Sequence, residues 1–217
     1  MSYDPEEIFW QNQRTNEDIM KTAIWNAKNE EEFNKHTERD TNFIKDHLSV
    51  NKDDVVLDFG CGKGRLIKPL SKYCKNIVGL DVNQSAISES KVYLEGIENS
   101  SCYEIPGNGR FVLNKLFDKI YSYIVLQHIN KYKVYNILLN LKKHLAPGGK
   151  GLFQFPNLLS NEEAYKIYAN DYVNLIGIPY SHMHFWTKDE AKFIFKLAGW
   201  SNIEFIDWES DFWIKAE

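Results

Sequence analysis

The chain has 217 residues and a formal net charge of -4, from 26 basic and 30 acidic residues, and this length suits one sizeable hydrophobic core. The mixed, slightly acidic charge lacks the footprint of a dedicated nucleic-acid binder, and no apolar run reaches membrane-spanning length, so neither nucleic acid nor a membrane is an expected partner. The three cysteines, Cys61, Cys74 and Cys102, have no paired spacing, which predicts neither disulfides nor a zinc site and fits a reducing cytoplasm.

Residues 1–50 are predicted to form a helical leader or lid. The first residues lack the basic region and the long apolar core of a signal peptide. Helix starts are indicated at Thr15 and near Asn29, each followed by apolar residues at helical spacing. The large aromatic residues of this leader either pack its helices onto the domain or cover a ligand site, and the sequence leaves both alternatives open.

From residue 54 onward, strand-like and helix-like segments alternate, which is typical of βαβ units and a parallel sheet. The breakers Ala146–Gly149 are predicted to end one of these helices. The segment 156–186 is longer than ordinary connections, and this length favours a lid-like insertion or binding loop. Strands are predicted at 55–59, 76–80, 102–105, 117–123, 151–155, 203–208 and 212–214, and helices at 66–70, 84–94, 132–145 and 187–199.

The most informative segment joins the first of these strands to the first helix. A buried, β-branched strand carries Asp58 near its end, and Gly60, Gly62 and Gly64 follow in a turn. Such turns hold nucleotide-bearing ligands at the carboxyl edge of open α/β sheets. The dinucleotide fingerprint G-x-G-x-x-G requires a glycine at position 65, where this chain has Arg65. The spacing therefore favours a nucleotide-type ligand other than a dinucleotide.

The pattern D-x-G-x-G-x-G, from Asp58 to Gly64, resembles motif I of the class I S-adenosylmethionine-dependent methyltransferases. The resemblance implies a Rossmann-like, seven-stranded, mostly parallel sheet over residues 51–217, with helices on both faces and an antiparallel C-terminal hairpin. It also implies S-adenosylmethionine as the cofactor, with Asp58 near the ammonium group. The turn residues implied to contact the methionine half are Gly60, Cys61, Gly62, Gly64 and Arg65.

Asp81, at the end of the second strand, is a further candidate for cofactor binding. Its two carboxylate oxygens can accept hydrogen bonds from both hydroxyls of a ribose, and its position about 20 residues after the turn suits that role. The alternative is that Asp81 caps the next helix. By resemblance, Val82 and Asn83 flank the adenine. Asn108 replaces an acid that commonly binds the adenine amino group.

The loop that holds Asn108 and Gly109 is assigned to cofactor binding, although a plain Gly-Asn-Gly turn is an equal alternative for Asn108. The segment 117–129 resembles motif IV of the same family. This resemblance implies that Ser122 and Tyr123 lie beside the sulfonium and that His128 lies near the transferred methyl group.

Three histidines are candidate general bases: His128, His182 and His184. The alternative for His128 is a hydrogen-bonded histidine that only shapes the pocket, and the His-x-His segment of the insertion either contacts substrate or packs onto the domain. No acidic cluster accompanies that pair, so no metal is predicted.

The sequence lacks the Asn/Asp-Pro-Pro-Tyr signature of enzymes that methylate base amino groups or glutamine. The resemblance therefore implies methyl transfer to an oxygen or nitrogen atom of a small molecule, such as a sugar or a natural-product intermediate. Two alternatives stay open: an RNA or protein methyltransferase, and a non-catalytic protein that binds the cofactor to support a partner.

Overall fold

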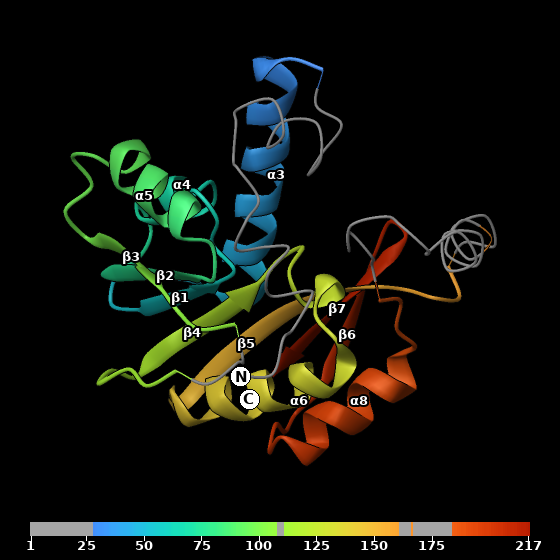
Figure 1. Cartoon of the computed structure of the whole chain (residues 1–217). Helices are drawn as coiled ribbons and strands as arrows, with labels where there is room; N and C mark the ends of the chain where they lie inside the picture. Colours follow the sequence, from blue (N-terminus) through green and yellow to red (C-terminus); the bar gives the residue numbers. More distant parts are fainter. Residues whose placement is uncertain (1–27, 108–110, 161–165, 167–183) are drawn as a thin grey trace.

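A computed structural model of the chain describes residues 28–107, 111–160, 166 and 184–217. Within them, seven strands form one sheet in the order β3-β2-β1-β4-β5-β7-β6 (Figure 1). Only β7 runs antiparallel, to β5 on one side and to β6 on the other. The strands are β1 Val55–Phe59, β2 Asn76–Asp81, β3 Ser100–Glu104, β4 Phe117–Ser122, β5 Leu145–Pro156, β6 Glu204–Trp208 and β7 Asp211–Ala216.

Helices cover both faces of this sheet, which confirms the predicted fold class (Figure 1). The helices α3, α4 and α5 lie on one face, whereas α6 and α8 lie on the other. Asparagine or threonine side chains cap α3, α5, α6 and α8, as expected for residues that satisfy free N–H groups at helix starts. The bounds are α3 Glu30–Leu48, α4 Ile67–Leu70, α5 Gln84–Tyr93, the 3-10 turn η1 Leu126–His128, α6 Lys131–Lys143 and α8 Lys188–Leu197.

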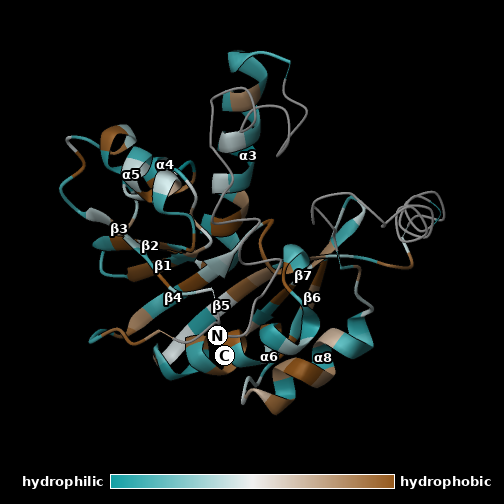
Figure 2. Ribbon diagram, in the orientation of Figure 1, coloured by the Kyte–Doolittle hydropathy of each residue, from teal (hydrophilic) through white to brown (hydrophobic). Residues whose placement is uncertain are grey.

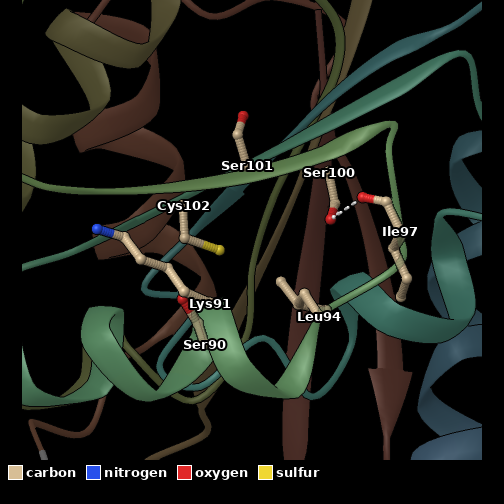
Figure 3. A pocket seen from close by; sticks show the side chains of 7 residues that line it. All are labelled: Ser90, Lys91, Leu94, Ile97, Ser100, Ser101 and Cys102. Atoms are coloured by element: carbon tan, nitrogen blue, oxygen red, sulfur yellow. Dashed lines mark hydrogen bonds between the residues drawn. The ribbon is translucent and has the colours of Figure 1, made fainter.

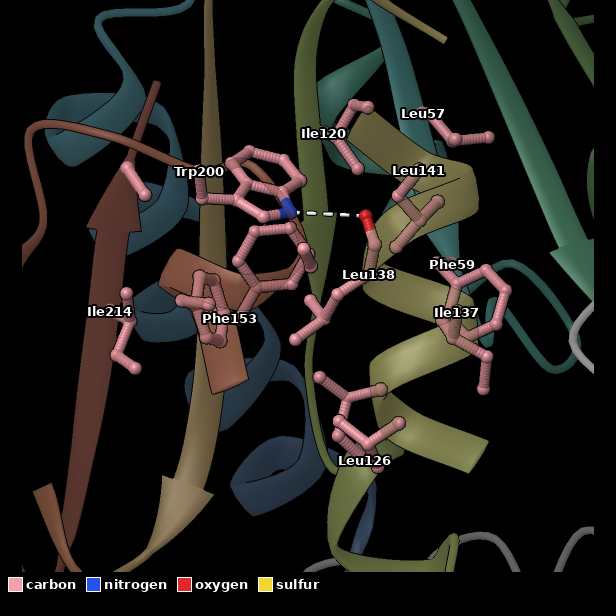
Figure 4. Packing of buried hydrophobic residues seen from close by; sticks show 14 of the residues in the cluster. Leu57, Phe59, Ile120, Leu126, Ile137, Leu138, Leu141, Phe153, Trp200 and Ile214 are labelled. Atoms are coloured by element: carbon pink, nitrogen blue, oxygen red, sulfur yellow. Dashed lines mark hydrogen bonds between the residues drawn. The ribbon is translucent and has the colours of Figure 1, made fainter. Parts of the chain in front are cut away.

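Side chains that alternate along the strands separate two hydrophobic cores, one on each face. In the α6-side core, Leu57 and Ile120 pack under α6, and the indole of Trp200 donates a hydrogen bond to the Leu138 carbonyl at 3.0 Å (Figure 4). In the α3-side core, the last turns of α3 lie against the sheet, and Figure 2 shows these turns as more hydrophobic than most of the helix above them.

Among the described residues, the start of one strand differs from its prediction, whereas the other predicted ends lie within a few residues of those observed. The breakers 146–149 follow the end of α6, as predicted, but they belong to β5, which begins at Leu145 rather than at 151. The register shows why: Phe117 pairs with Leu145, and the next pair is Lys119 with Lys150, so the intervening residues form a bulge in one continuous strand. The predicted helix 66–70 is a single turn, Ile67–Leu70.

The two ends of the predicted insertion, 156–186, are hydrogen-bonded to each other at the end of β5. The N–H of Leu158 donates to the Trp186 carbonyl at 2.9 Å, and the N–H of Trp186 donates to the Pro156 carbonyl at 2.9 Å. Most of the insertion and the predicted helix start at Thr15 lie outside the described residues, so the lid role stays a prediction. Within the part of the chain that the structure describes, every helix is too short or too polar to cross a membrane.

Candidate functional site

The turn after β1 has the backbone that its glycines permit. Gly60, Gly62 and Gly64 have φ angles of 85°, 53° and 85°, a region that residues with side chains rarely enter. The N–H groups of Gly60 and Cys61 both donate to the Leu80 carbonyl, at 2.7 and 3.0 Å, and this fixes the turn against the end of β2. A Cβ atom on Gly62 would meet nothing within 4 Å, so this glycine faces open space.

Asp81 joins the end of β2 to this turn. One carboxylate oxygen accepts the N–H of Gly62 at 2.8 Å, and the other accepts the N–H of Asn83 at 2.9 Å. Burial raises the pKa of Asp81, and the N–H groups of Asn83, Gly62 and Val82 oppose that rise. A carboxylate has about four lone-pair sites, so these backbone donors leave room for a ligand hydroxyl. Asp81 is therefore oriented by backbone donors and still able to accept from a ligand.

The cap of α5 is Asn83, whose side chain accepts the N–H of Ala86 at 3.0 Å. The capping role that was the alternative for Asp81 thus belongs to its neighbour two residues later. Asn83 is buried, whereas Val82 is half-buried and packs against the α6-side core. Neither side chain was predicted to have these structural roles, and contact of either residue with an adenine stays a prediction.

Asp58 is a buried acid on the α3 side of β1. In the sheet it lies between Gly79 of β2 and Tyr121 of β4. Burial raises the pKa of Asp58 to about 8, and the Tyr121 hydroxyl and the Arg65 guanidinium act against that rise. The Tyr121 hydroxyl is itself buried and lies outside good hydrogen-bonding geometry. A cationic ligand group beside Asp58 would favour the ionised carboxylate.

Arg65 points to α3. Its guanidinium is buried and donates to Asp40 at 2.9 Å and to the Thr37 hydroxyl at 3.3 Å. Asp40 also accepts from Arg39 at 3.3 Å and from the Tyr123 hydroxyl at 3.5 Å. Burial raises the pKa of Asp40, and the two arginines oppose the rise. Arg65 and Tyr123, both predicted to bind the cofactor, therefore share one acid on the helical leader.

The end of β4 is fixed by two polar contacts. Ser122, a predicted cofactor residue, is buried and donates to the Phe59 carbonyl at 2.9 Å. Ile124 has a φ angle of 58°, a strained value for a β-branched residue, and its N–H donates to the Gln154 side chain at 2.9 Å. The same Gln154 donates to Gln127 at 3.2 Å and to Asp211 at 2.7 Å. This buried amide holds the loop that leads to His128.

The structure brings two of the three candidate histidines together around Gln127. A ring nitrogen of His128 lies 3.1 Å from the Gln127 side-chain nitrogen, and the backbone N–H of His184 donates to the Gln127 carbonyl at 2.6 Å. His182 lies outside the described residues, as do Asn108 and Gly109. Among the residues that are described, no three His, Cys, Asp or Glu side chains form a group suited to a metal ion.

Sequence reasoning missed Asp40, Gln154 and Asp211. A weak signal existed for Gln154, because it is a polar residue inside the apolar run 151–155. No such signal existed for Asp40, because only the packing of α3 brings it next to Arg65. Together, the site consists of the backbone of the glycine turn with open space at Gly62, the acids Asp58 and Asp81 near the carboxyl ends of β1 and β2, and Ser122 at the end of β4. Such an arrangement can bind a ribose and a cationic group close together.

Comparison with known proteins gives a family. A family model described as "Methyltransferase domain" matches residues 31–204, which is more than half of the chain. A probable cobalt-precorrin-6B C(15)-methyltransferase of Methanocaldococcus jannaschii is 33% identical over 100 residues, 43% of this chain and 55% of that protein. A ubiquinone biosynthesis O-methyltransferase of Rickettsia akari is 27% identical over 133 residues, 61% of this chain and 51% of that protein. The chain thus spans about half the length of these relatives.

A solved structure gives the same fold. The N-methyltransferase NodS of Bradyrhizobium japonicum, in complex with S-adenosyl-L-homocysteine, superposes with a TM-score of 0.68. The match covers 98% of both chains at 17% sequence identity.

Proposed function

Because the chain belongs to the methyltransferase-domain family, we propose that it is a class I S-adenosylmethionine-dependent methyltransferase with a small-molecule acceptor. The observation that carries the proposal is the glycine turn whose Gly62 N–H is bound by Asp81 at 2.8 Å. This contact connects the opening above Gly62 to an acid that can bind a ribose. The residues present fit the cofactor, since a Cβ atom on Gly62 would point into open space.

In this proposal each part of the site has a defined task. Asp81 accepts the ribose hydroxyls, and Asp58 balances the positive charge of the ammonium group. Ser122 keeps the end of β4 against β1 through its bond to Phe59, at 2.9 Å. The cofactor supplies a methyl group on a positively charged sulfur. Positioning of the acceptor behind that methyl group is the main contribution that the protein makes to the rate.

An oxygen or nitrogen acceptor must also lose a proton. His128 and His184 are the candidate bases, because both lie at Gln127, next to the loop that follows β4. The names of similar proteins, an O-methyltransferase of ubiquinone biosynthesis and the N-methyltransferase NodS, support a small acceptor without choosing the atom. Three free cysteines support a reducing compartment, which we propose to be the cytoplasm.

The binding step is tested by calorimetry with S-adenosylhomocysteine. We expect the intact protein to bind it, and Asp81→Ala to weaken binding by about 10-fold or more, since hydrogen bonds to a charged group contribute roughly 1.5–3 kcal/mol. The matched control is Asp53→Ala, which removes an exposed acid just before the amino end of β1 and should leave the affinity unchanged. Binding of a nicotinamide dinucleotide in place of S-adenosylhomocysteine would contradict the proposal.

The transfer step is tested with methyl-labelled S-adenosylmethionine and extracts separated into small molecules, RNA and protein. We expect label in the small-molecule fraction, and a loss of at least about 100-fold in rate for the variant, His128→Gln or His184→Gln, that removes the base. The matched change at His47, a half-buried histidine of α3, should have no effect. Label in RNA or protein would replace the small-molecule acceptor with the corresponding alternative. Cofactor binding without any labelled product would favour the non-catalytic alternative.

A further inference from the structure

We infer that Cys102 is a modification site for peroxides, and that Cys61 in the glycine turn is the second thiol, which converts the modified Cys102 into a disulfide. The two cysteines come from different elements, β3 and the turn after β1. Neither has a task in the proposed transfer reaction beyond the predicted contact of Cys61 with the cofactor. The consequence for cofactor binding rests on the proposed function, whereas the thiol chemistry does not.

The fold brings the two thiols together over a glycine. Cys102 of β3 is in register with Gly79 of β2. A Cβ atom on Gly79 would lie 2.6 Å from the Cys61 sulfur, which therefore fills the space above this glycine. In-register residues on neighbouring parallel strands point to the same face. The sulfur of Cys61 consequently lies next to the side chain of Cys102, and each thiol shifts the pKa of the other, raising that of Cys61 and lowering that of Cys102.

Cys102 is also reachable from outside. It lines a cavity of about 190 Å³ between β3 and α5, and Figure 3 shows its sulfur directed into the space between these two elements. A water molecule occupies about 30 Å³ of liquid volume, so hydrogen peroxide fits. The other lining residues are Ser90, Lys91, Leu94, Ile97, Ser100 and Ser101. Cys61 does not line this cavity, which makes Cys102 the thiol that meets the peroxide first.

The surroundings favour the thiolate at Cys102. The neighbouring Cys61 thiol, the Ser90 side chain and the Gly79 N–H lower the pKa of Cys102 to about 7 against the effect of burial. Cys74 provides the contrast within the same chain, because burial raises its pKa to about 11. Since the thiolate is the reactive form, Cys102 should react near neutral pH and Cys74 should not.

The chemistry balances with hydrogen peroxide as the oxidant. The Cys102 thiolate attacks one peroxide oxygen, the O–O bond breaks, and the departing hydroxide takes a proton to become water, leaving a sulfenic acid. The Cys61 sulfur then attacks the sulfenic sulfur, the S–O bond breaks, and the departing hydroxide leaves with the Cys61 proton as a second water. The two thiols together lose two electrons, which the peroxide gains.

The disulfide would pull the glycine turn toward β3. A disulfide holds its sulfurs about 2.05 Å apart, well inside the contact distance of two sulfur atoms that are not bonded. Cys61 stands between Gly60 and Gly62, and Gly62 donates to Asp81 at 2.8 Å. Movement of Cys61 therefore displaces the turn from the acid proposed to bind the ribose, and cofactor affinity falls.

The test treats the reduced protein with hydrogen peroxide and measures intact mass and bridged peptides. We expect a loss of about 2 Da and one bridge between Cys61 and Cys102. Cys74→Ser should form the same bridge as the unmodified chain, whereas Cys102→Ser should form no bridge and should show no 2 Da loss. Cys61→Ser should hold a sulfenic acid on Cys102 that dimedone traps. A bridge that includes Cys74, or three unreacted thiols after treatment, would overturn the inference.

Calorimetry with S-adenosylhomocysteine tests the consequence. Oxidation should raise the Kd about fivefold or more in the intact chain, dithiothreitol should reverse the change, and Cys102→Ser should show the same Kd before and after peroxide. An unchanged Kd in the fully bridged protein would overturn the link to cofactor binding. If the reduced protein fails to bind the ligand at all, the proposed function fails, while the mass measurement still decides the thiol chemistry.

Discussion

The Asp58 carboxyl differs in protonation between the folded and the unfolded protein over a wide range of pH. In the unfolded chain it ionises near 3.8, whereas burial raises its pKa to about 8 in the fold. Between these values the folded state binds more protons than the unfolded state, so the free energy of unfolding falls as pH rises through this window. Above about pH 8, Asp58 is a buried charge that destabilises the protein.

We therefore expect Asp58→Asn to stabilise the fold at high pH and to have little effect at low pH. The amide matches the shape of the protonated carboxyl, which explains the small effect near pH 5. Near pH 8.5 the variant should unfold at a higher temperature than the unmodified chain. Each kcal/mol of stability gained should raise the Tm by about 2–4 °C. Thermal unfolding at a series of pH values measures this difference. A difference in Tm between the variant and the unmodified chain that is the same at every pH would contradict the raised pKa of Asp58.

Residue positions and backbone conformation at the site were predictable where they depend on local rules, whereas the ligand contacts of these residues stay predictions. Asp58, the three glycines and Asp81 follow from the order of strand, turn and helix, and the turn has the positive φ angles that glycine permits. The contacts of Arg65 and Gln154 were not predictable, because they depend on how α3 and β5 pack. A sequence pattern locates residues along a strand, but it gives no direct measure of which distant side chains meet.

At the scale of elements, one ion pair joins the helical leader to the glycine turn. Asp40 of α3 and Arg65 are both buried, with 2.9 Å between the carboxylate oxygen and the guanidinium nitrogen. Removal of one partner from a buried pair leaves an uncompensated charge, which costs about 3–5 kcal/mol, whereas an apolar replacement of both is often neutral. The pair thus makes the position of the turn depend on α3.

We expect Asp40→Asn to lower stability by about 3 kcal/mol, and the double change Asp40→Leu with Arg65→Met to recover most of that loss. The control is Asp46→Asn on the same helix, whose exposed pair with Lys45 at 3.3 Å should contribute no more than about 0.5 kcal/mol. Denaturant unfolding measures all three variants. Equal losses of stability in Asp40→Asn and Asp46→Asn would show that the buried ion pair stabilises the protein no more than the exposed one does.

Element positions were predicted well where apolar periodicity and breakers agree. The residues 55–59 are β1, and predicted helix ends lie within a few residues of those observed. The exception is β5, which was predicted to begin at 151, after the breakers Pro147 and Gly148, although these residues form a bulge inside the strand. Breakers indicate where a helix stops, but pairing with β4 decides whether a loop or a strand comes next, and such pairing is a property of the whole sheet.

At the scale of the molecule, both cores share one sheet. Val56 and Leu57 are neighbours in β1, yet they belong to the α3-side and α6-side cores respectively. A helix on either face therefore stabilises the same strands. The division into a leader, 1–50, and a domain, 51–217, stays a prediction, and Ile44 and Leu48 of α3 are fully buried in the α3-side core of the sheet.

We accordingly expect residues 30–217 to unfold as one cooperative unit. Ile44→Ala on α3 and Leu138→Ala on α6 each remove a fully buried side chain and should each cost about 2–5 kcal/mol. Hydrogen exchange in increasing denaturant checks the coupling: each variant should lower the protection of α3 and of β4 by the same amount. If Ile44→Ala lowers protection in α3 alone, then α3 is a separable leader, and the Asp40 to Arg65 ion pair does not couple it to the site.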